Sequence, residues 1–413
     1  MEQRRKNLTQ LFIPICLETL LYMLSGMVDT LMLSSVNDQA VGAVGTANTY
    51  IGIFIIMFSV ISSGMVAVMT QNIGAGRPGV AYQARQLGLA FNAVLGIILS
   101  LILAFGAGTI LAGVGVADAL MQPARTYLQI VGGFCILNAL IPICSSYLRA
   151  FGFSKEPLYA SIIGNVINFC LNAFFLFVLH KGVAGVATAT VVSRIINLVI
   201  VVLLGAVLVK AKKHPERESN REVMGQIIRI GLPSACETAI YNVSMTLVIR
   251  FLNQMDAQGL NVTARSYTMQ ITNFSYCVGA ALAQANAIMT GWRIGAKEYD
   301  ACDRGTRKAA IIGVIVAVIL ETMFALCSGW IMQLFSKDPQ MVSLVGKLLA
   351  IDIVLEMGRV TNLVYGQALK TSGDAVFPVV MGACFMILCS VGGTYLFGIR
   401  LGLLAVGAYI GMA

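Results

Sequence analysis

The stretch FIPICLETLLYMLSGMVDTLML, residues 12–33, decides the fold class. It is predominantly apolar, and its only charged residues are Glu18 and Asp29. A stretch of this length spans a hydrocarbon layer of about 30 Å when it is helical. No small-residue cleavage site interrupts it, so we expect a transmembrane helix and not a removable signal peptide.

Similar apolar runs follow one another along the rest of the 413 residues. Hydrophobic residues make up 58% of the chain and charged residues 11%, a larger apolar share than a soluble domain needs. We therefore expect an all-α polytopic membrane protein with twelve transmembrane helices. The expected spans are 8–34, 43–70, 86–112, 124–149, 157–180, 183–209, 229–253, 261–290, 306–333, 339–369, 376–398 and a last one that starts near 402.

The formal net charge of +9 is explained by topology. Lys and Arg gather in alternate polar segments, such as the N-terminal residues and the stretch KAKKHPERESNREVMGQ at 210–226. Basic loops stay on the cytoplasmic side, so we expect a multi-pass protein of the cell membrane with a cytoplasmic N-terminus. The charge therefore gives no reason to expect a nucleic-acid partner.

The sequence repeats itself. FIPICLETLLY at 12–22 returns as IGLPSACETAIY at 230–241, and LRAFGFSKEP at 148–157 returns as LKTSGDAVFP at 369–378. An even number of helices in each copy makes the copies parallel repeats, which favours a transport site associated with the two halves. The expected division is a first six-helix bundle at 1–209, a cytoplasmic linker at 210–228 and a second six-helix bundle at 229–413.

The last helix is the one mismatch between the copies. The sixth span runs roughly from Gly182 to Lys210, whereas its counterpart starts near Gly402 and the sequence stops at Ala413. We therefore expect the twelfth helix to be truncated.

Polar residues that occur in one copy only are candidates for function. Asp29 corresponds to Val248 in the second copy, and the asparagines of the fifth span correspond to apolar or small residues. Helical periodicity places those asparagines on one stripe. Hard oxygen ligands of this kind suit a proton or Na⁺. The expected ion-coupling residues are Asp29, Asn165, Asn168, Asn172 and Thr190, with a possible Na⁺ at Asp29 and no other metal.

Further polar residues are candidates for lining a substrate cavity. Two of them, Glu18 and Glu237, occur in both copies, so a structural role and a role in the cavity are both open. Glu356 and Arg359 could pair with each other within the tenth span or contact substrate. The expected cavity residues are Glu18, Tyr22, Glu237, Tyr241, Asp352, Glu356, Arg359 and Asn362.

Several motifs resemble one known family. MVDTLML at 27–33, QNIGAG at 71–76 and GVAGVATAT at 182–190 are similar in order and spacing to the MATE (multidrug and toxic compound extrusion) family. LEMGRVTNLVYGQALKTSGDAVFP at 355–378 resembles one bacterial branch of it. By similarity, Asp29 falls on the coupling aspartate of the first span, and Asn172 stands where some members carry a second aspartate.

The resemblance implies a secondary active efflux transporter. Such a protein exports organic cations and other amphipathic compounds in exchange for H⁺ or Na⁺ by alternating access. It needs a lipid bilayer and small-molecule substrates but no cofactor, and we expect a monomer. Which of the two ions drives this chain stays open, because Asn172 departs from the aspartate of some members.

Two other classes of function compete with this one. A lipid-linked precursor flippase of the same wider superfamily tends to carry several cationic residues in its cavity. Here few basic residues lie within the expected spans, Arg194, Arg250, Arg265 and Arg359 among them. An intramembrane enzyme is not expected, because the chain has no HExxH-like motif and no plausible nucleophile–base pair.

Overall fold

The computed structural model describes residues 6–34, 38–113, 116, 118–209, 216–255, 259–333, 336 and 338–413. Every regular element among these residues is a helix. The chain divides into a first unit, Met1–Leu232, and a second unit, Pro233–Ala413. The boundary falls inside helix α8 (Asn220–Met255), which begins within the range expected for the linker. Residues 210–215 of that linker lie outside the described residues, and the domain division expected from the repeat stays a prediction.

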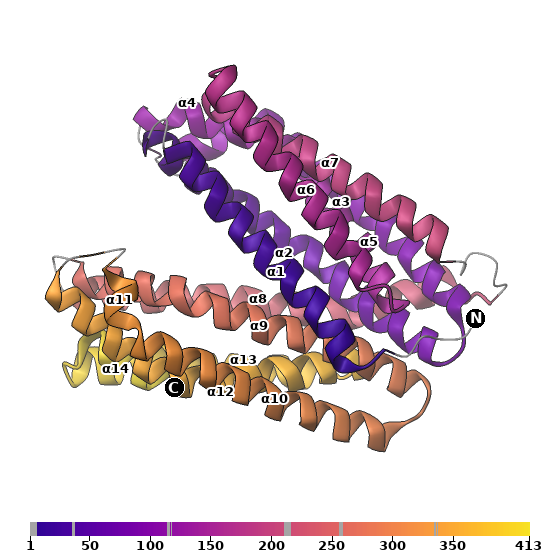
Figure 1. The fold of residues 1–413 in the computed structure, drawn as a ribbon. Helices are drawn as coiled ribbons and strands as arrows, with labels where there is room; N and C mark the ends of the chain where they lie inside the picture. Colours follow the sequence, from indigo (N-terminus) through magenta and orange to yellow (C-terminus); the bar gives the residue numbers. More distant parts are fainter. Residues whose placement is uncertain are drawn as a thin grey trace. The chain divides into compact units, whose positions relative to one another are not determined.

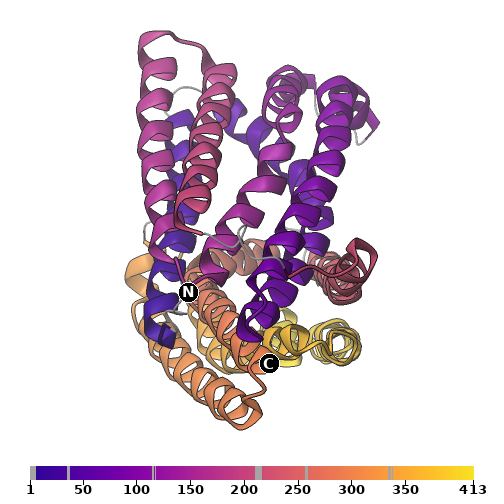
Figure 2. The same ribbon diagram turned by 90° about the vertical axis from the view of Figure 1, so that its right-hand side faces the viewer.

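The first unit is a bundle of long helices (Figures 1 and 2). Helix α1 packs on α6, α6 packs on α7, and α2 packs on α3. Gly76 has a left-handed backbone, with φ of 75°, where the chain reverses between α2 and α3. The elements are α1 (Leu8–Ser34), α2 (Asp38–Gly74), α3 (Pro78–Gly113), α4 (Asp118–Tyr127), η1 (Leu128–Gly132), α5 (Ile136–Ala150), α6 (Lys155–Ala173), η2 (Phe174–Val178) and α7 (Gly182–Leu208), where η1 and η2 are π-helices.

The fourth expected span is a bent pair of helices. The segments Leu120–Gly132 and Ile136–Ala150 meet at 42°. Gly132 lies at this break against α3, where a Cβ atom would come 2.9 Å from the Cβ atom of Leu103. The close approach of α3 therefore accompanies the bend, and the small residue permits it.

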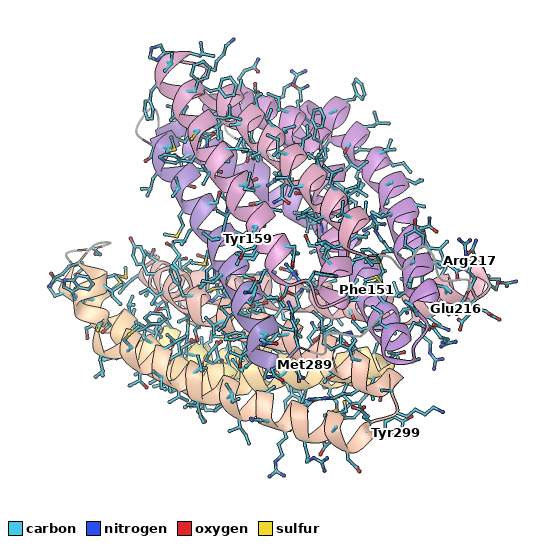
Figure 3. All side chains as sticks on the ribbon, turned by 45° about the vertical axis from the view of Figure 1, so that its right-hand side comes forward. Phe151, Tyr159, Glu216, Arg217, Met289 and Tyr299 are labelled. Atoms are coloured by element: carbon cyan, nitrogen blue, oxygen red, sulfur yellow. The ribbon has the colours of Figure 1, made fainter. Side chains whose placement is uncertain are left out.

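Aromatic and charged side chains pack together near the chain turns of the first unit. Tyr147 of α5 packs edge-on against Phe151, with ring centroids 5.1 Å apart, and the Arg85 guanidinium lies over the Tyr147 ring. Figure 3 shows Phe151 just after α5 and Tyr159 on α6, and it places Glu216 and Arg217 together where the described chain resumes. The next residue, Glu218, pairs with Arg77 at 2.5 Å and so attaches this segment to the start of α3.

The second unit is built around α9, α10 and α12, which pack on one another (Figure 1). Its last helix, α14, packs on the long π-helix η4 through glycines. A Cβ atom on Gly411 would lie 2.4 Å from the carbonyl carbon of Gly393, so only small residues fit there. The elements after α8 are α9 (Leu260–Gly295), α10 (Tyr299–Leu326), α11 (Ser328–Met332), α12 (Pro339–Ser372), α13 (Val376–Phe385), η4 (Met386–Arg400) and α14 (Leu404–Met412).

The helices confirm the expected all-α membrane fold. Of the described helices, seven are long and apolar enough to cross a membrane, or eight if the bent pair counts as one span. Helices α8, α9 and α12 are equally long but carry more polar side chains. The fifth and the eleventh spans both end in π-helix, as η2 and η4, so the two copies share this local feature as well as their sequence.

Candidate functional site

Asp29 forms a hydrogen-bonded chain with two asparagines in the first unit. The Asn172 amide nitrogen donates to Asp29 Oδ1 at 2.6 Å. The same nitrogen lies 3.2 Å from Asn168 Oδ1. Both asparagines are buried, with 5% of Asn168 and none of Asn172 exposed. The packing of α1 on α6 thus brings together three of the five residues expected to couple ions.

Local sequence explains why these side chains meet. Asn168 and Asn172 are four residues apart, which places them on one face of α6. Gly164 lies one turn earlier, and a Cβ atom there would already touch Asn197 of α7 at 3.4 Å. Small residues thus let α7 come close to α6. Directly after Asn172 the helix changes to the π-helix η2, a distortion that is frequent at functional sites.

One polar atom of this group is left without a partner. Asn172 Oδ1 is buried and finds no hydrogen-bond donor among the described residues. An amide oxygen in that condition carries a desolvation cost that a bound cation or a protonated partner removes. Beside the Asp29 carboxylate, it is an oxygen ligand of the kind that Na⁺ and other hard cations take.

The other two expected ligands point elsewhere. The Asn165 amide nitrogen donates to the Leu21 carbonyl at 3.4 Å. Thr190 donates to the Val186 carbonyl of its own helix. Among the described residues, neither of these two side chains forms a hydrogen bond with Asp29, so their role in ion coupling stays a prediction.

Arg194 is a neighbour of Asp29 that the sequence reasoning did not assign. It lies on α7 one turn after Thr190 and acts electrostatically on Asp29 and on Tyr127 of α4. The signal in the sequence was an arginine inside the apolar span GVAGVATATVVSRIINLVIVVLLGAVL. A fixed positive charge in the surroundings of Asp29 favours the ionised form of its carboxylate.

Glu18 and Glu237 each form an ion pair with a basic residue. Glu18 pairs with Arg149 at 2.5 Å, and Glu237 pairs with Lys370. Arg149 and Lys370 occupy equivalent positions in LRAFGFSKEP and LKTSGDAVFP, so the same pair occurs once in each copy. This recurrence favours the structural role for both glutamates. Tyr22, the other expected cavity residue of the first unit, is 68% exposed.

The second unit contains a cavity of about 1260 Å³. Four of the expected cavity residues line it, namely Tyr241, Asp352, Arg359 and Asn362. Methionines are numerous in its wall, and their flexible thioethers adapt to ligands of different shape. The apolar and aromatic lining includes Met245, Met269, Met357, Met381, Met386, Met412, Tyr276, Phe385, Phe397 and Tyr409.

Three buried acids, one of which lines this cavity, lie close together. Ligand oxygens of Glu321 on α10 and of Asp352 and Glu356 on α12 lie within 4.8 Å of one another. Glu356 also pairs with Arg359 at 2.6 Å, the pairing within the tenth span that the sequence left open. Glu321 and Asp352 have no basic partner in an ion pair within the described part of the chain. Carboxylates this close repel each other unless a proton or a cation lies between them.

Glu321 was missed at the level of sequence. It is fully buried in the stretch VILETMF at 318–324, which reads as an ordinary apolar span with one acid. The acid itself was the only signal, because its partners lie on another helix. The packing of α10 on α12 makes it part of a cluster.

Comparison with known proteins places the chain among transporters. A model of the MatE family matches residues 14–174 and 233–396. An uncharacterized transporter of Bacillus subtilis, YisQ, is 33% identical over 403 residues, which cover 96% of this chain and 88% of that protein. A probable multidrug resistance protein NorM of Thermotoga maritima is 23% identical over 425 residues, covering 99% of this chain and 89% of that protein.

Solved structures have the same fold. A MATE protein in the bent conformation aligns with a TM-score of 0.89 at 18% identity, covering 98% of this chain and 90% of that one. An outward-facing multidrug resistance MATE family transporter aligns with a TM-score of 0.88 at 17% identity, covering 98% of this chain and 91% of that one. These matches confirm the resemblance that the motifs indicated.

Proposed function

Because the chain belongs to the MatE family of membrane transporters, we propose that it is a secondary active exporter. It expels organic compounds that are cationic or amphipathic in exchange for H⁺ or Na⁺, by alternating access. It acts as a monomer in the cell membrane, with its N-terminus in the cytoplasm, and needs no cofactor. The basic segments of the sequence support this orientation.

The hydrogen-bonded chain from Asp29 to Asn172 and Asn168 carries the proposal. A carboxylate inside a membrane span costs about 2.5–3.5 kcal/mol on insertion scales, so its presence in one copy only favours a function. The unpartnered Asn172 Oδ1 provides a second oxygen beside it. The coupling ion binds to these oxygens when the transporter faces outward.

Binding of the ion changes the charge of the site. With H⁺ or Na⁺ bound, the Asp29 carboxylate is neutralised, and without the ion it is negative. Arg194 and the Asn172 amide stabilise the empty, ionised state. The site therefore alternates between a loaded and an empty form of different charge, which is the requirement for coupling an ion gradient to a conformational change.

The cavity of the second unit provides the substrate site. Its size of about 1260 Å³ exceeds the usual range for a drug-sized ligand, and its methionine and aromatic wall suits amphipathic molecules of varied shape. The Glu321–Asp352–Glu356 cluster, of which Asp352 lines the cavity, adds acidic groups to this unit. Substrate binding and ion binding thus use different units of the chain.

Reconstituted protein tests the proposal. Proteoliposomes loaded with a fluorescent amphiphile should release it when an H⁺ or a Na⁺ gradient is imposed, and Asp29→Asn should abolish gradient-driven release. Asp300→Asn, which changes an exposed aspartate at the start of α10, is the matched control and should transport like the wild type. Gradient-driven release by well-inserted Asp29→Asn at the wild-type rate would remove Asp29 from the mechanism.

A further inference from the structure

Arg265 is a buried cation that forms no ion pair with any residue that the structure describes. It lies on α9, has 6% of its surface exposed and lines the cavity of the second unit. Its Nη2 donates a hydrogen bond to the Met245 sulfur at 3.5 Å. A thioether is a weak acceptor, and within the described part of the chain no carboxylate pairs with Arg265.

The second arginine of the cavity is in a different situation. Arg359 pairs with Glu356 at 2.6 Å and also acts on Asp352, so its charge is offset by acids of its own helix. The positive charge of Arg359 in turn offsets the negative charge of Asp352, which also lines the cavity. Of these two cavity arginines, Arg265 is the one that has no ion pair in the described part of the chain. A buried charge without a partner is costly, and in a membrane cavity it is retained where a ligand supplies the opposite charge.

The residues that follow Arg265 on α9 form a stripe along the cavity. Met269, Thr272 and Tyr276 come four, seven and eleven residues after it, which is the spacing of one helix face, and all three line the cavity. At 1.5 Å per residue this stripe is about 16 Å long. It begins with a guanidinium and continues with a thioether, a hydroxyl and an aromatic ring.

We propose that this cavity binds amphipathic organic anions. The carboxylate, sulfonate or phosphate group contacts the Arg265 guanidinium, which presents a planar set of donors suited to such oxyanions. The apolar body lies along α9 over Met269 and Tyr276. Export of these anions rests on the proposed function, and their binding does not. The proposal adds amphipathic acids to the cationic and amphipathic substrates of the proposed function.

Equilibrium binding tests this directly. The full chain is placed in nanodiscs of zwitterionic lipid and titrated with the anionic dye 8-anilinonaphthalene-1-sulfonate and, separately, with the cationic dye ethidium. Arg265→Met keeps the length of the side chain and removes its charge, and Arg265→Lys keeps the charge. Arg250→Met, which removes an exposed arginine of α8 outside the cavity, is the matched control.

We expect Arg265→Met to weaken binding of the anionic dye about tenfold, because one charge-assisted hydrogen-bonded contact is lost. Arg265→Lys should retain part of the affinity, Arg250→Met all of it, and the cationic dye should bind Arg265→Met at least as well as the wild type. An unchanged unfolding temperature verifies the fold of each variant. Should Arg265→Met misfold, Arg265→Gln and the salt dependence of wild-type binding decide the same question.

Equal affinity of the anionic dye for Arg265→Met and Arg250→Met would overturn the proposal, as would salt-independent binding to the wild type.

A second series with phosphatidylglycerol in the nanodiscs identifies the source of the anion. Displacement of the dye by this lipid would identify a lipid phosphate as the ligand, and undisturbed binding would identify a soluble organic acid. No ion gradient is present in this binding experiment. Failure of ion-coupled export would therefore not affect the binding result, and failure of anion binding would not affect the proposal of ion-coupled export.

Discussion

Asp29 occupies a helix position at which an ionised carboxylate is costly in a membrane. The neighbouring amide of Asn172 and the charge of Arg194 reduce that cost, whereas the free Asn172 Oδ1 remains available to a ligand. The sequence could identify Asp29, because the repeat shows an apolar residue at the equivalent position. It could not identify Arg194 or Glu321 as site residues, since their partners lie on other helices.

A first prediction tests, with single substitutions, whether ion coupling and substrate preference belong to different units. Asn168→Ala and Asn172→Ala should raise the ion concentration needed for half-maximal export by about tenfold or more, because groups that orient or complete an ion site typically contribute this much. Asp352→Asn and Glu356→Gln should instead alter the relative rates for anionic and cationic dyes. Initial rates of dye export at varied Na⁺ and pH measure both effects.

Asn197→Ala, on α7 beside α6, is a control for loss of an amide outside the hydrogen-bonded chain. Should all four substitutions cause the same loss of ion dependence without any change in dye preference, the assignment of ion and substrate to different units is wrong.

At the scale of elements, hydropathy predicted the helices closely but not their interruptions. The run expected at 8–34 corresponds to α1 (Leu8–Ser34), whereas the run at 124–149 is a bent pair and the run at 376–398 is largely π-helix. These features accompany close approaches between helices, such as Gly132 to Leu103 and Gly411 to Gly393. A pattern of apolar residues contains no information on how closely two backbones approach.

The ion pairs Glu18–Arg149 and Glu237–Lys370, each of which joins two helices, lead to a second prediction. Glu18→Gln should lower the unfolding temperature, because it leaves Arg149 with one ionic partner fewer in a largely buried position, at a cost of about 1–3 kcal/mol. The exchange Glu18→Arg with Arg149→Glu should recover part of the loss. Glu237→Gln should behave in the same way, because Lys370 repeats the pair in the second unit.

Thermal unfolding of the purified variants measures these effects, and export is measured alongside. Glu222→Gln, an exposed acid in the first turn of α8, is the control. If Glu18→Gln and Glu237→Gln kept the stability of the wild type and lost export, both glutamates would have a direct role in transport and the structural interpretation would fail.

For the molecule as a whole, we propose that the first unit couples the ion and the second unit binds the substrate. Exchange of one monovalent cation for one monovalent organic cation moves no net charge across the membrane. Exchange of one inward cation for one outward organic anion moves two charges, each worth about 2.3 kcal/mol per 100 mV. Membrane voltage therefore distinguishes the two classes of substrate, while the ion gradient is required for both.

Efflux from proteoliposomes under separately imposed H⁺ gradients, Na⁺ gradients and membrane voltages is the most direct measurement of this coupling. We predict that dissipating the gradient of the coupling ion stops export of anionic and cationic dyes alike. Collapse of the voltage alone should slow export of the anionic dye and leave that of the cationic dye largely intact. Export that followed the voltage and ignored both ion gradients would contradict ion-coupled exchange at Asp29.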